Sequence, residues 1–409
     1  MPLPTGARAR EILRVVLINI VILSGLYALA EIGLHLVSPD RNPLFGTALR
    51  IPDRVFHHTL WPHFEGYDVW GDQRYRVVTN SLGFKDGSPR VVPMEADRQR
   101  IVFIGDSFTE GIGLPYEQTF VGRFARMFPE IDVLNAGVVS YAPSAYYEKL
   151  KYLIDLGLKF DEVFVYIDIS DVRDEAVGYC YDEHGVLQMR NLQSCGYGPC
   201  PSGEPVPKVW WKETLKETFY IPNFIYQTVK KRWRASVSDA SNAAATAADG
   251  TQPGAAYSRR SDVRASWTYD ENTPCFGWPG IEGGIRKARA QMDQLYQLLA
   301  ERGIALSVGV YPWPQQLLYD DEESRHVKIW REWCAGKCRS FFNHFPAFFR
   351  YKREHPDFLK DLFIWGDIHY NARGNLVLAD SLIEQYRSRS QSANDADAGG
   401  SWSGSAQLR

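Results

Sequence analysis

The sequence predicts a three-layer α/β/α fold around a parallel sheet, preceded by one N-terminal transmembrane helix. Short apolar runs alternate with longer segments of helical periodicity, which is typical of a parallel sheet covered on both faces. The apolar run 101–104 leads directly into Gly105, Asp106 and Ser107, where the chain turns before the next helix. An uncharged apolar stretch near the N-terminus indicates the transmembrane helix.

Residues 15–37 are predicted to form a membrane anchor. The preceding residues, 1–14, hold three arginines and one glutamate, whereas residues 15–30 hold no charged side chain. As a helix the span would rise about 35 Å, enough to cross a hydrocarbon core of about 30 Å. Basic residues before the span favour a cytoplasmic N-terminus, so the rest of the chain is expected outside the cytoplasmic membrane. The alternatives are a signal peptide cleaved at the small residues 28–30 and a buried helix of a soluble protein.

The composition gives no support to a nucleic-acid partner. The 409 residues are 45% hydrophobic, which is enough to bury the core of one large domain or two. Lysine and arginine number 46 and aspartate and glutamate number 49, for a net charge of −3. Nucleic-acid-binding proteins normally show an excess of basic residues.

The six cysteines are expected to form disulfides, because an exported chain meets an oxidising compartment. Many connectivities are open to six cysteines. Pairing within the two close couples is predicted, Cys195 with Cys200 and Cys334 with Cys338. A zinc site is the alternative, but neither couple has the usual two-residue spacing beside a histidine pair, so no metal is predicted.

The predicted strands and helices follow the hydrophobic pattern in chain order. Residues 38–97 form an N-terminal extension, in which short strands and a loop are expected to pack on the core. Strands are predicted at 101–104, 131–135, 161–167 and 304–310, and helices at 118–128, 145–156, 285–302 and 372–387. The α/β core is therefore expected to comprise residues 98–205 and 263–388.

An insertion at residues 206–262 interrupts this core. Its first part, 206–234, combines aromatic and basic residues and is interpreted as a cap helix that packs on the domain. Contact with anionic lipid headgroups is the alternative. Residues 236–262, rich in serine, alanine and glycine, are predicted to form a flexible linker, and the tail 389–409 is predicted to be disordered.

Ser107 is the candidate nucleophile, because a serine at the carboxyl end of a buried strand stands where open α/β sheets place ligands. A serine hydroxyl needs a base that is itself oriented by a third group. Asp367 and His369 lie two positions apart just before the last predicted helix. Asp367 could therefore orient His369 while His369 takes the Ser107 proton. The alternatives for the Gly-Asp-Ser turn are a helix cap and a phosphate-binding loop of a flavodoxin-like protein.

Four segments together resemble the sequence blocks of the SGNH/GDSL hydrolase family. They are Gly105-Asp106-Ser107, Asn135-Ala136-Gly137, the segment from Asp168 to Asp171, and Asp367 with His369. The resemblance covers residues 98–180 and 285–388. It implies Ser107 as the nucleophile, His369 as the base and Asp367 as its partner.

The resemblance also implies an oxyanion hole made by Ser107, Gly137 and a side chain of the third block. The family has an asparagine there, whereas this sequence has Ser170, whose hydroxyl reaches less far. One oxyanion donor is worth about 3–4 kcal/mol in the transition state, so this departure matters. A second departure is that Asp367 lies two residues before the histidine instead of the usual three. That shorter spacing occurs in relatives that act on polysaccharide acetyl groups.

The function implied by the resemblance is an envelope-exposed, membrane-anchored serine esterase or O-acyltransferase with an acyl-enzyme on Ser107. Acetylated glycans are the expected substrate class, lipid esters come second, and polysaccharide-modification proteins are expected partners. No cofactor is expected, because the sequence holds no nucleotide-binding fingerprint. A non-catalytic carbohydrate-binding or assembly protein is the alternative, motivated by Ser170.

Overall fold

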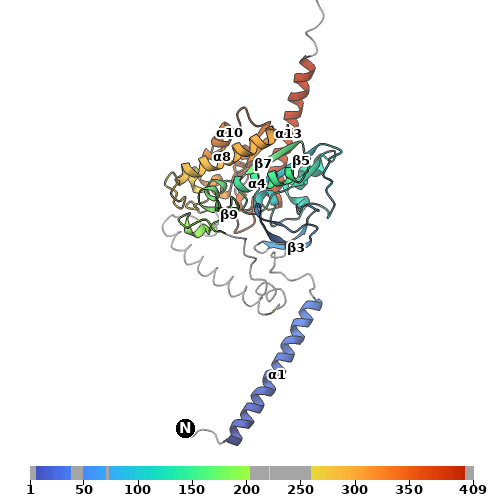
Figure 1. The fold of residues 1–409 in the computed structure, drawn as a ribbon, viewed down its shortest axis with the longest axis vertical. Coiled ribbons are helices and arrows are strands. Elements are labelled where there is room, and N and C mark those ends of the chain that lie inside the picture. The colour runs from blue at the N-terminus through green and yellow to red at the C-terminus, as the bar shows by residue number, and fades with distance from the viewer. Residues whose placement is uncertain (1–5, 38–48, 71–72, 203–220, 222–258, 401–409) are drawn as a thin grey trace, which may run out of the picture. The chain divides into compact units, whose positions relative to one another are not determined.

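The computed structural model describes residues 6–37, 49–70, 73–202, 221 and 259–400 (Figure 1). The chain divides into two compact units, one of residues 1–45 and 206–249 and the other of residues 46–205 and 250–409. Nearly all of the predicted insertion, 206–262, lies outside the described residues, because they include only residues 221 and 259–262 of it.

The first unit contains helix α1, Gly6–Val37, which is long and apolar enough to cross a membrane. The most apolar 18-residue stretch of its part Arg10–Gly33 has a mean hydropathy of 2.3, and none of that stretch is buried inside the protein. The helix begins before the predicted span because residues 6–14 are mostly strong helix formers. Near its end the Tyr27 hydroxyl donates a hydrogen bond to the Glu31 carboxylate at 2.8 Å, which partly satisfies this charge in an apolar segment.

The second unit is built on a five-stranded parallel sheet with the order β11-β10-β7-β5-β6. Its strands are β5 (Arg100–Gly105), β6 (Asp132–Asn135), β7 (Glu162–Ile167), β10 (Ala305–Val310) and β11 (Ser340–Asn343). The first four are the predicted strands, so the predicted fold class is confirmed. The edge strand β11 was not predicted, because its four residues carry only two apolar side chains.

The central strands β5 and β7 are buried along their whole length. Strands covered on both faces show continuous apolar runs instead of an alternating pattern, which explains the run 101–104 in the sequence. Glu162 is the charged exception in β7. Its carboxylate is paired with Arg389 of the last helix at 2.7 Å, so the buried charge is compensated.

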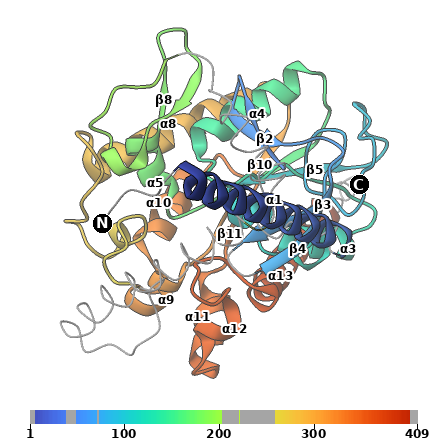
Figure 2. The ribbon, with the colours of Figure 1, turned by 90° about the horizontal axis from the view of Figure 1, so that it is seen from below.

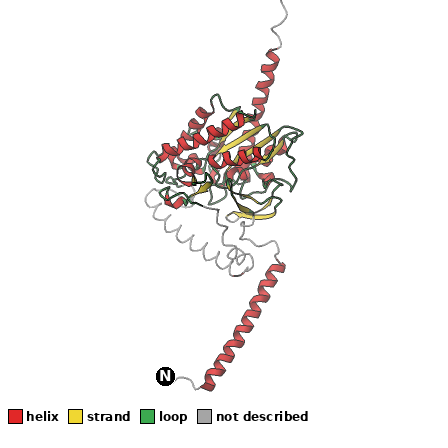
Figure 3. Ribbon diagram, viewed as in Figure 1, coloured by secondary structure: helices red, strands yellow, loops and turns green. Residues whose placement is uncertain are grey.

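Helices cover both faces of the sheet (Figures 1 and 3). Three of them pack on one face, α4 (Pro143–Asp155), α8 (Gly280–Ala300) and α10 (Arg325–Cys334), and two on the other, α3 (Phe120–Met127) and α13 (Ala372–Gly400). Right-handed crossovers require this division, because the chain runs from β5 out to β6 and then back past β5 to β7. The reversal puts the topological switch point beside β5, where open α/β sheets bind ligands.

Shorter elements connect these layers. They are α2 (Ser107–Glu110), α5 (Asp171–Arg173), α9 (Pro314–Tyr319), α11 (Phe345–Glu354), α12 (Phe358–Leu362), a π-helical turn at Asp174–Gly178, and 3-10 turns at Tyr116–Gln118, Leu192–Ser194 and Ser266–Thr268. The predicted nucleophile is thus the first residue of α2.

The last helix, α13, ends at Gly400 and not at the predicted residue 387. The predicted disorder of the tail 389–409 stays a prediction. Residues 388–398 contain three alanines and no proline, so nothing in them stops a helix that is already docked on α3. Residues 401–409 lie outside the described residues.

The N-terminal extension forms two short antiparallel hairpins, β1 (Arg50–Asp53) with β2 (His57–Leu60) and β3 (Glu65–Trp70) with β4 (Gln73–Val78). The short strands expected in this segment are therefore present. Arg50 joins the extension to the core, because its guanidinium pairs with Asp68 of β3 at 2.8 Å and with Glu110 of α2.

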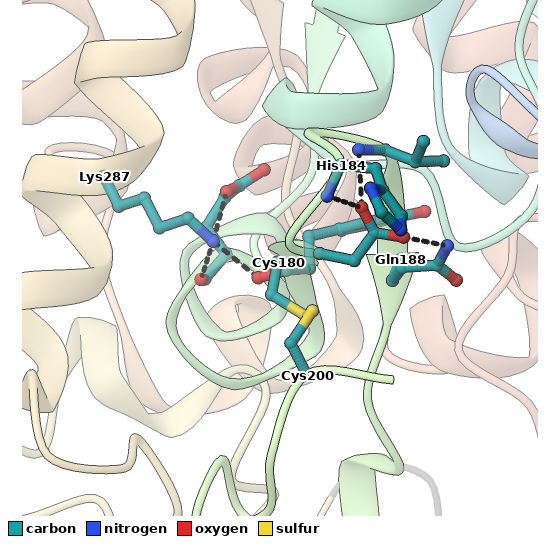
Figure 4. The surroundings of a disulfide bond; sticks show 9 residues. Cys180, His184, Gln188, Cys200 and Lys287 are labelled. Carbon is teal, nitrogen blue, oxygen red and sulfur yellow. Dashed lines mark hydrogen bonds and ion pairs between the residues drawn. A yellow bond between two sulfur atoms is a disulfide. The ribbon is translucent and has the colours of Figure 1, made fainter. Parts of the chain in front are cut away.

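A third hairpin, β8 (Tyr179–Tyr181) with β9 (Leu187–Met189), lies on a different side of the unit from β3 (Figures 1 and 2). The Cys180–Cys200 disulfide attaches it to the chain that follows (Figure 4). Lys287 of α8 donates hydrogen bonds to the carbonyl oxygens of Glu175 and Tyr179 at 2.8 and 2.6 Å. The start of the hairpin is therefore fixed to α8 as well.

The disulfides correct one predicted pairing and confirm the other. Besides Cys180–Cys200 they are Cys195–Cys275 and Cys334–Cys338. The last pair lies at the end of α10, where the Cys338 N–H donates to the Cys334 carbonyl at 3.0 Å and the turn itself brings the side chains together. Cys195 instead leaves its 3-10 turn in the left-handed conformation and meets Cys275 through tertiary packing. Close spacing therefore predicted the pairing only where a tight turn brings the two cysteines together.

Candidate active site

Ser107 follows β5 at the carboxyl edge of the sheet and is only 6% exposed. The turn before it is narrow, because a Cβ at Gly105 would lie 2.2 Å from Thr109 Oγ1. Asp106 caps α2 by accepting a hydrogen bond from the Phe108 N–H at 2.9 Å. The glycine and the cap together fix the place of the serine on the sheet edge.

His369 and Asp367 approach Ser107 from the turn before α13. The Ser107 Oγ and His369 Nε2 atoms are 2.8 Å apart. The Nδ1 atom of the same imidazole contacts Asp367 Oδ1, and the His369 backbone N–H donates to that oxygen at 3.0 Å. The Phe108 ring packs on the imidazole, with centroids 4.7 Å apart. The structure thus brings the three predicted residues together, with the histidine between the serine and the aspartate.

Trp70, the last residue of β3, is a further contact of this pair. Its indole N–H donates a hydrogen bond to Asp367 Oδ2 at 3.0 Å. Its ring meets the His369 imidazole edge to face, with centroids 5.2 Å apart. The two carboxylate oxygens of Asp367 therefore have separate partners, His369 on Oδ1 and Trp70 on Oδ2.

Asp367 is held in its charged form. Burial raises the pKa of this carboxyl, but the hydrogen bonds and charge of His369, together with the bond from Trp70, outweigh burial and lower the pKa below its usual value. A carboxylate on Nδ1 keeps the proton of the neutral imidazole on that nitrogen and leaves Nε2 as an acceptor for the serine proton. It also stabilises the imidazolium that forms after the transfer.

Gly137 and Ser170, two of the predicted oxyanion donors, follow the strands β6 and β7. The Gly137 backbone packs directly on α2, because a Cβ there would lie 2.7 Å from the Glu110 nitrogen. The Gly137 N–H donates to Asn135 Oδ1 at 3.1 Å, and the Ser170 hydroxyl donates to Asp168 Oδ1 at 2.6 Å. Each of these two hydrogen bonds would have to break before its donor could bind an oxyanion, so the oxyanion hole stays a prediction.

A buried polar cluster lies next to Ser107 at the ends of β5, β7 and β10. The Tyr311 hydroxyl contacts both Asp106 Oδ1, at 3.1 Å, and Asp168 Oδ2, at 2.9 Å. The Trp313 indole N–H donates to Asp168 Oδ2 at 2.6 Å. Ser107 Oγ itself lies 3.2 Å from Asp106 Oδ2. The Ser107 Oγ atom is therefore in contact with this cluster as well as with His369.

No metal site is evident in the described part of the chain. Among its residues, no group of three or more histidine, cysteine, aspartate or glutamate side chains is arranged to hold a metal ion.

Sequence reasoning missed Trp70, Tyr311 and Trp313. Tyr311 and Trp313 follow the predicted strand 304–310, and side chains at the carboxyl end of a parallel strand are candidates for the site. That signal could have found them. Trp70 carries no such signal, because it lies 297 positions before Asp367 and meets it only through tertiary packing.

Comparison with known proteins finds similar solved structures only. No family model matches the chain, and no curated protein matches its sequence. LAE5, an α/β hydrolase from the metagenome of Lake Arreo, is 14% identical, with a TM-score of 0.37 over 71% of this chain and 96% of that one. A lipolytic G-D-S-L family protein from Veillonella parvula is 11% identical, with a TM-score of 0.35 over 70% and 97%.

A catalytic mutant of Axe2, an acetylxylan esterase from Geobacillus stearothermophilus, is also similar. It is 12% identical, with a TM-score of 0.35 over 72% of this chain and 96% of that one. In this chain itself the parallel sheet carries Ser107 after β5, and His369 lies just before the last helix. This is the three-layer α/β/α arrangement around a parallel sheet that the sequence predicted.

Proposed function

We propose that this chain is a membrane-anchored serine esterase or O-acyltransferase that works through an acyl-enzyme on Ser107. The observation that carries the proposal is the 2.8 Å contact between Ser107 Oγ and His369 Nε2, with Asp367 on the other imidazole nitrogen. A serine, an imidazole and a carboxylate in this order are the groups that acyl transfer needs.

The reaction has two halves. In the first, His369 Nε2 takes the Ser107 proton while Oγ attacks the ester carbonyl, and the imidazolium then gives that proton to the leaving alcohol. In the second, water or a sugar hydroxyl loses its proton to His369 and attacks the acyl-serine. The imidazolium then returns a proton to Oγ as the acyl–oxygen bond breaks, which regenerates Ser107 and neutral His369. The predicted donors Gly137 and Ser170, with the Ser107 N–H, would bind the oxyanion in both halves.

The environment of the site is proposed to be the outer face of the cytoplasmic membrane. Helix α1 is long and apolar enough for an anchor, and basic residues precede its apolar part. All six cysteines are paired, which fits an oxidising compartment. Acetylated glycans are the proposed substrates and polysaccharide-modification proteins the proposed partners, on the strength of the sequence resemblance.

A non-catalytic carbohydrate-binding protein is the second candidate. The observation that favours it is the Ser170 hydroxyl, whose one proton is donated to Asp168 at 2.6 Å and not toward Ser107. The short contact between Ser107 and His369 has no evident purpose in a protein that only binds, so the enzyme is the better supported candidate.

The test is turnover of p-nitrophenyl acetate by the full chain in detergent. We expect Ser107→Ala to lower kcat by a factor on the order of 10³ or more, because it removes the nucleophile. Ser388→Ala, at an exposed serine of α13, is the matched control and should keep the wild-type rate. Equal rates for Ser107→Ala and the wild type would refute the enzyme. Adding a glycan acceptor and identifying the products by mass spectrometry would distinguish a transferase, which acylates the glycan, from an esterase.

A further inference from the structure

Three side chains at the carboxyl edge of the sheet make more oxygen–oxygen contacts than the single Tyr311 proton can turn into hydrogen bonds. Asp106, Asp168 and Tyr311 follow the neighbouring strands β5, β7 and β10, and each is at least nine-tenths buried. The Tyr311 oxygen is 3.1 Å from Asp106 Oδ1 and 2.9 Å from Asp168 Oδ2. A phenol has a single proton to donate, so only one of these two contacts receives it from Tyr311.

Asp168 is the carboxylate that is built to be charged. Its Oδ1 accepts hydrogen bonds from the Ser170 N–H at 2.7 Å and from the Ser170 hydroxyl at 2.6 Å. Its Oδ2 accepts one from the Trp313 indole at 2.6 Å and is the nearer of the two contacts of Tyr311. Four donors are directed at the two oxygens of Asp168. A proton on either oxygen would therefore face a donor and would have no acceptor.

Asp106 has the opposite surroundings. The Phe108 N–H is its one backbone donor, on Oδ1. Its Oδ2 lies 3.2 Å from Ser107 Oγ, but the serine proton is directed at His369 Nε2, because Asp367 holds the imidazole proton on Nδ1. The contact between Oδ2 and Oγ therefore joins two oxygens and lacks a proton unless Asp106 supplies it.

We propose that Asp106 is a catalytic residue that works as a neutral carboxylic acid and donates a hydrogen bond from Oδ2 to Ser107 Oγ. The electrostatics agree with this geometry. Burial, and then the nearby charge of Asp168, raise the pKa of Asp106 well above its usual value. The hydrogen bond from the Phe108 N–H opposes that rise without cancelling it.

The role in the reaction rests on the proposed function. When the Ser107 proton passes to His369 Nε2, Oγ carries developing negative charge, and the Asp106 O–H stabilises it. The same donor helps when Oγ leaves the acyl group in the second half of the reaction. The Asp106 proton stays on Asp106 throughout, so His369 remains the acid and the base.

The test compares Asp106→Asn with Asp106→Ala. An asparagine is the isostere of a neutral aspartic acid, because its NH₂ group can donate to Oγ while its carbonyl accepts from the Phe108 N–H. We expect Asp106→Asn to lose no more than about tenfold in kcat/KM for p-nitrophenyl acetate, and Asp106→Ala about 10²-fold or more. Asp168→Asn is the contrast, since its NH₂ group would face two of the four donors, and we expect it to lose more than Asp106→Asn.

Infrared spectroscopy of the full chain reads the protonation state without any turnover. The wild type minus Asp106→Asn difference at neutral pH should contain the carbonyl stretch of a protonated carboxyl, shifted in D₂O. Asp97→Asn, at an exposed site, should leave that band unchanged. Asp171, whose pKa is also raised by burial, contributes a band that remains in both spectra and cancels.

Two results would overturn the proposal. One is a difference spectrum with carboxylate bands and no protonated carboxyl, which would show that Asp106 is charged. The other is equal loss of kcat/KM in Asp106→Asn and Asp106→Ala, with both variants folded by circular dichroism, which would show that the donor does not matter. An inactive wild type with the protonated band present would refute the esterase function and leave the neutral Asp106 standing.

Discussion

The indole N–H of Trp70 donates a hydrogen bond to Asp367 Oδ2, and the two residues are 297 positions apart. Trp70 belongs to the N-terminal extension, while Asp367 belongs to the turn before the last helix. The extension is therefore part of the candidate active site, because it supplies one of the partners that hold the Asp367 carboxylate. Variants of the extension should affect catalysis as well as stability.

Trp70→Phe tests this relationship, because it keeps an aromatic ring and removes the N–H. We expect kcat to fall about tenfold with little change in KM, since one hydrogen bond to a charged group is worth about 1.5–3 kcal/mol. Losing a donor also raises the pKa of Asp367, so in the pH profile of stability the contribution of this carboxylate should be lost at a higher pH on acidification. Trp61→Phe, at a 54% exposed site in the same extension, is the control. A Trp70→Phe variant with an unchanged pH profile would contradict the positioning role.

The Arg50 ion pairs should be essential for the stability of the second unit. Arg50 pairs with Asp68 and Glu110, whose side chains are each only 1% exposed. Arg50→Met leaves two buried carboxylates without their cation, and we expect a loss of about 3–5 kcal/mol in the free energy of unfolding. Denaturant unfolding monitored by tryptophan fluorescence measures it.

The matched control for Arg50 is Arg76→Met in β4. Arg76 pairs with Glu65 at the surface, where both side chains are about half exposed. Exposed pairs contribute less than about 1 kcal/mol, so this variant should unfold close to the wild type. Similar losses in the two variants would show that burial does not decide the strength of these pairs.

Gly137→Ala should displace α2. The added Cβ would lie 2.7 Å from the Glu110 nitrogen and 2.8 Å from Thr109 Cβ, and neither backbone nor Cβ can move aside alone. We expect a loss of stability of about 1–3 kcal/mol and a larger proportional loss of kcat, because α2 carries Ser107. Gly87→Ala is the control, since its Cβ would meet only a Tyr116 ring carbon at an ordinary 3.6 Å. Wild-type kcat in Gly137→Ala would refute the tight packing.

The pH dependence of stability should report the charge on Asp367. Its pKa in the folded protein lies below the usual value, so its contribution is fully present above the pKa of the unfolded chain, about 3.9. That contribution is lost as the pH falls through the lower folded pKa. The difference in unfolding free energy between the wild type and Asp367→Asn should therefore be larger near pH 7 than near pH 3. Thermal and urea unfolding at the two pH values check it, and an equal difference at both would contradict it.

Local patterns in the sequence determined the parts of this protein that depend on neighbours along the chain. The apolar runs that became β5 and β7 are continuous because those strands are buried on both faces. Burial on both faces requires consecutive apolar residues, which the sequence shows directly. Ser107 and the Asp367–His369 pair were found because each lies at a strand end or in a turn with a recognisable local pattern. The Cys334–Cys338 pairing was predicted because the two cysteines are only four positions apart, and the tight turn after α10 brings them together.

Only the tertiary structure decided which contacts form between segments that are far apart in the sequence. The Cys195–Cys275 disulfide, the Trp70 contact with Asp367 and the bridge of Tyr311 between Asp106 and Asp168 join residues whose sequence positions carry no shared pattern. A hydrogen bond or disulfide needs two atoms within a few ångströms, and for residues far apart only the packing of the whole fold sets that distance. Sequence therefore identified the three candidate catalytic residues, and tertiary packing placed around them the groups that affect their charge and position.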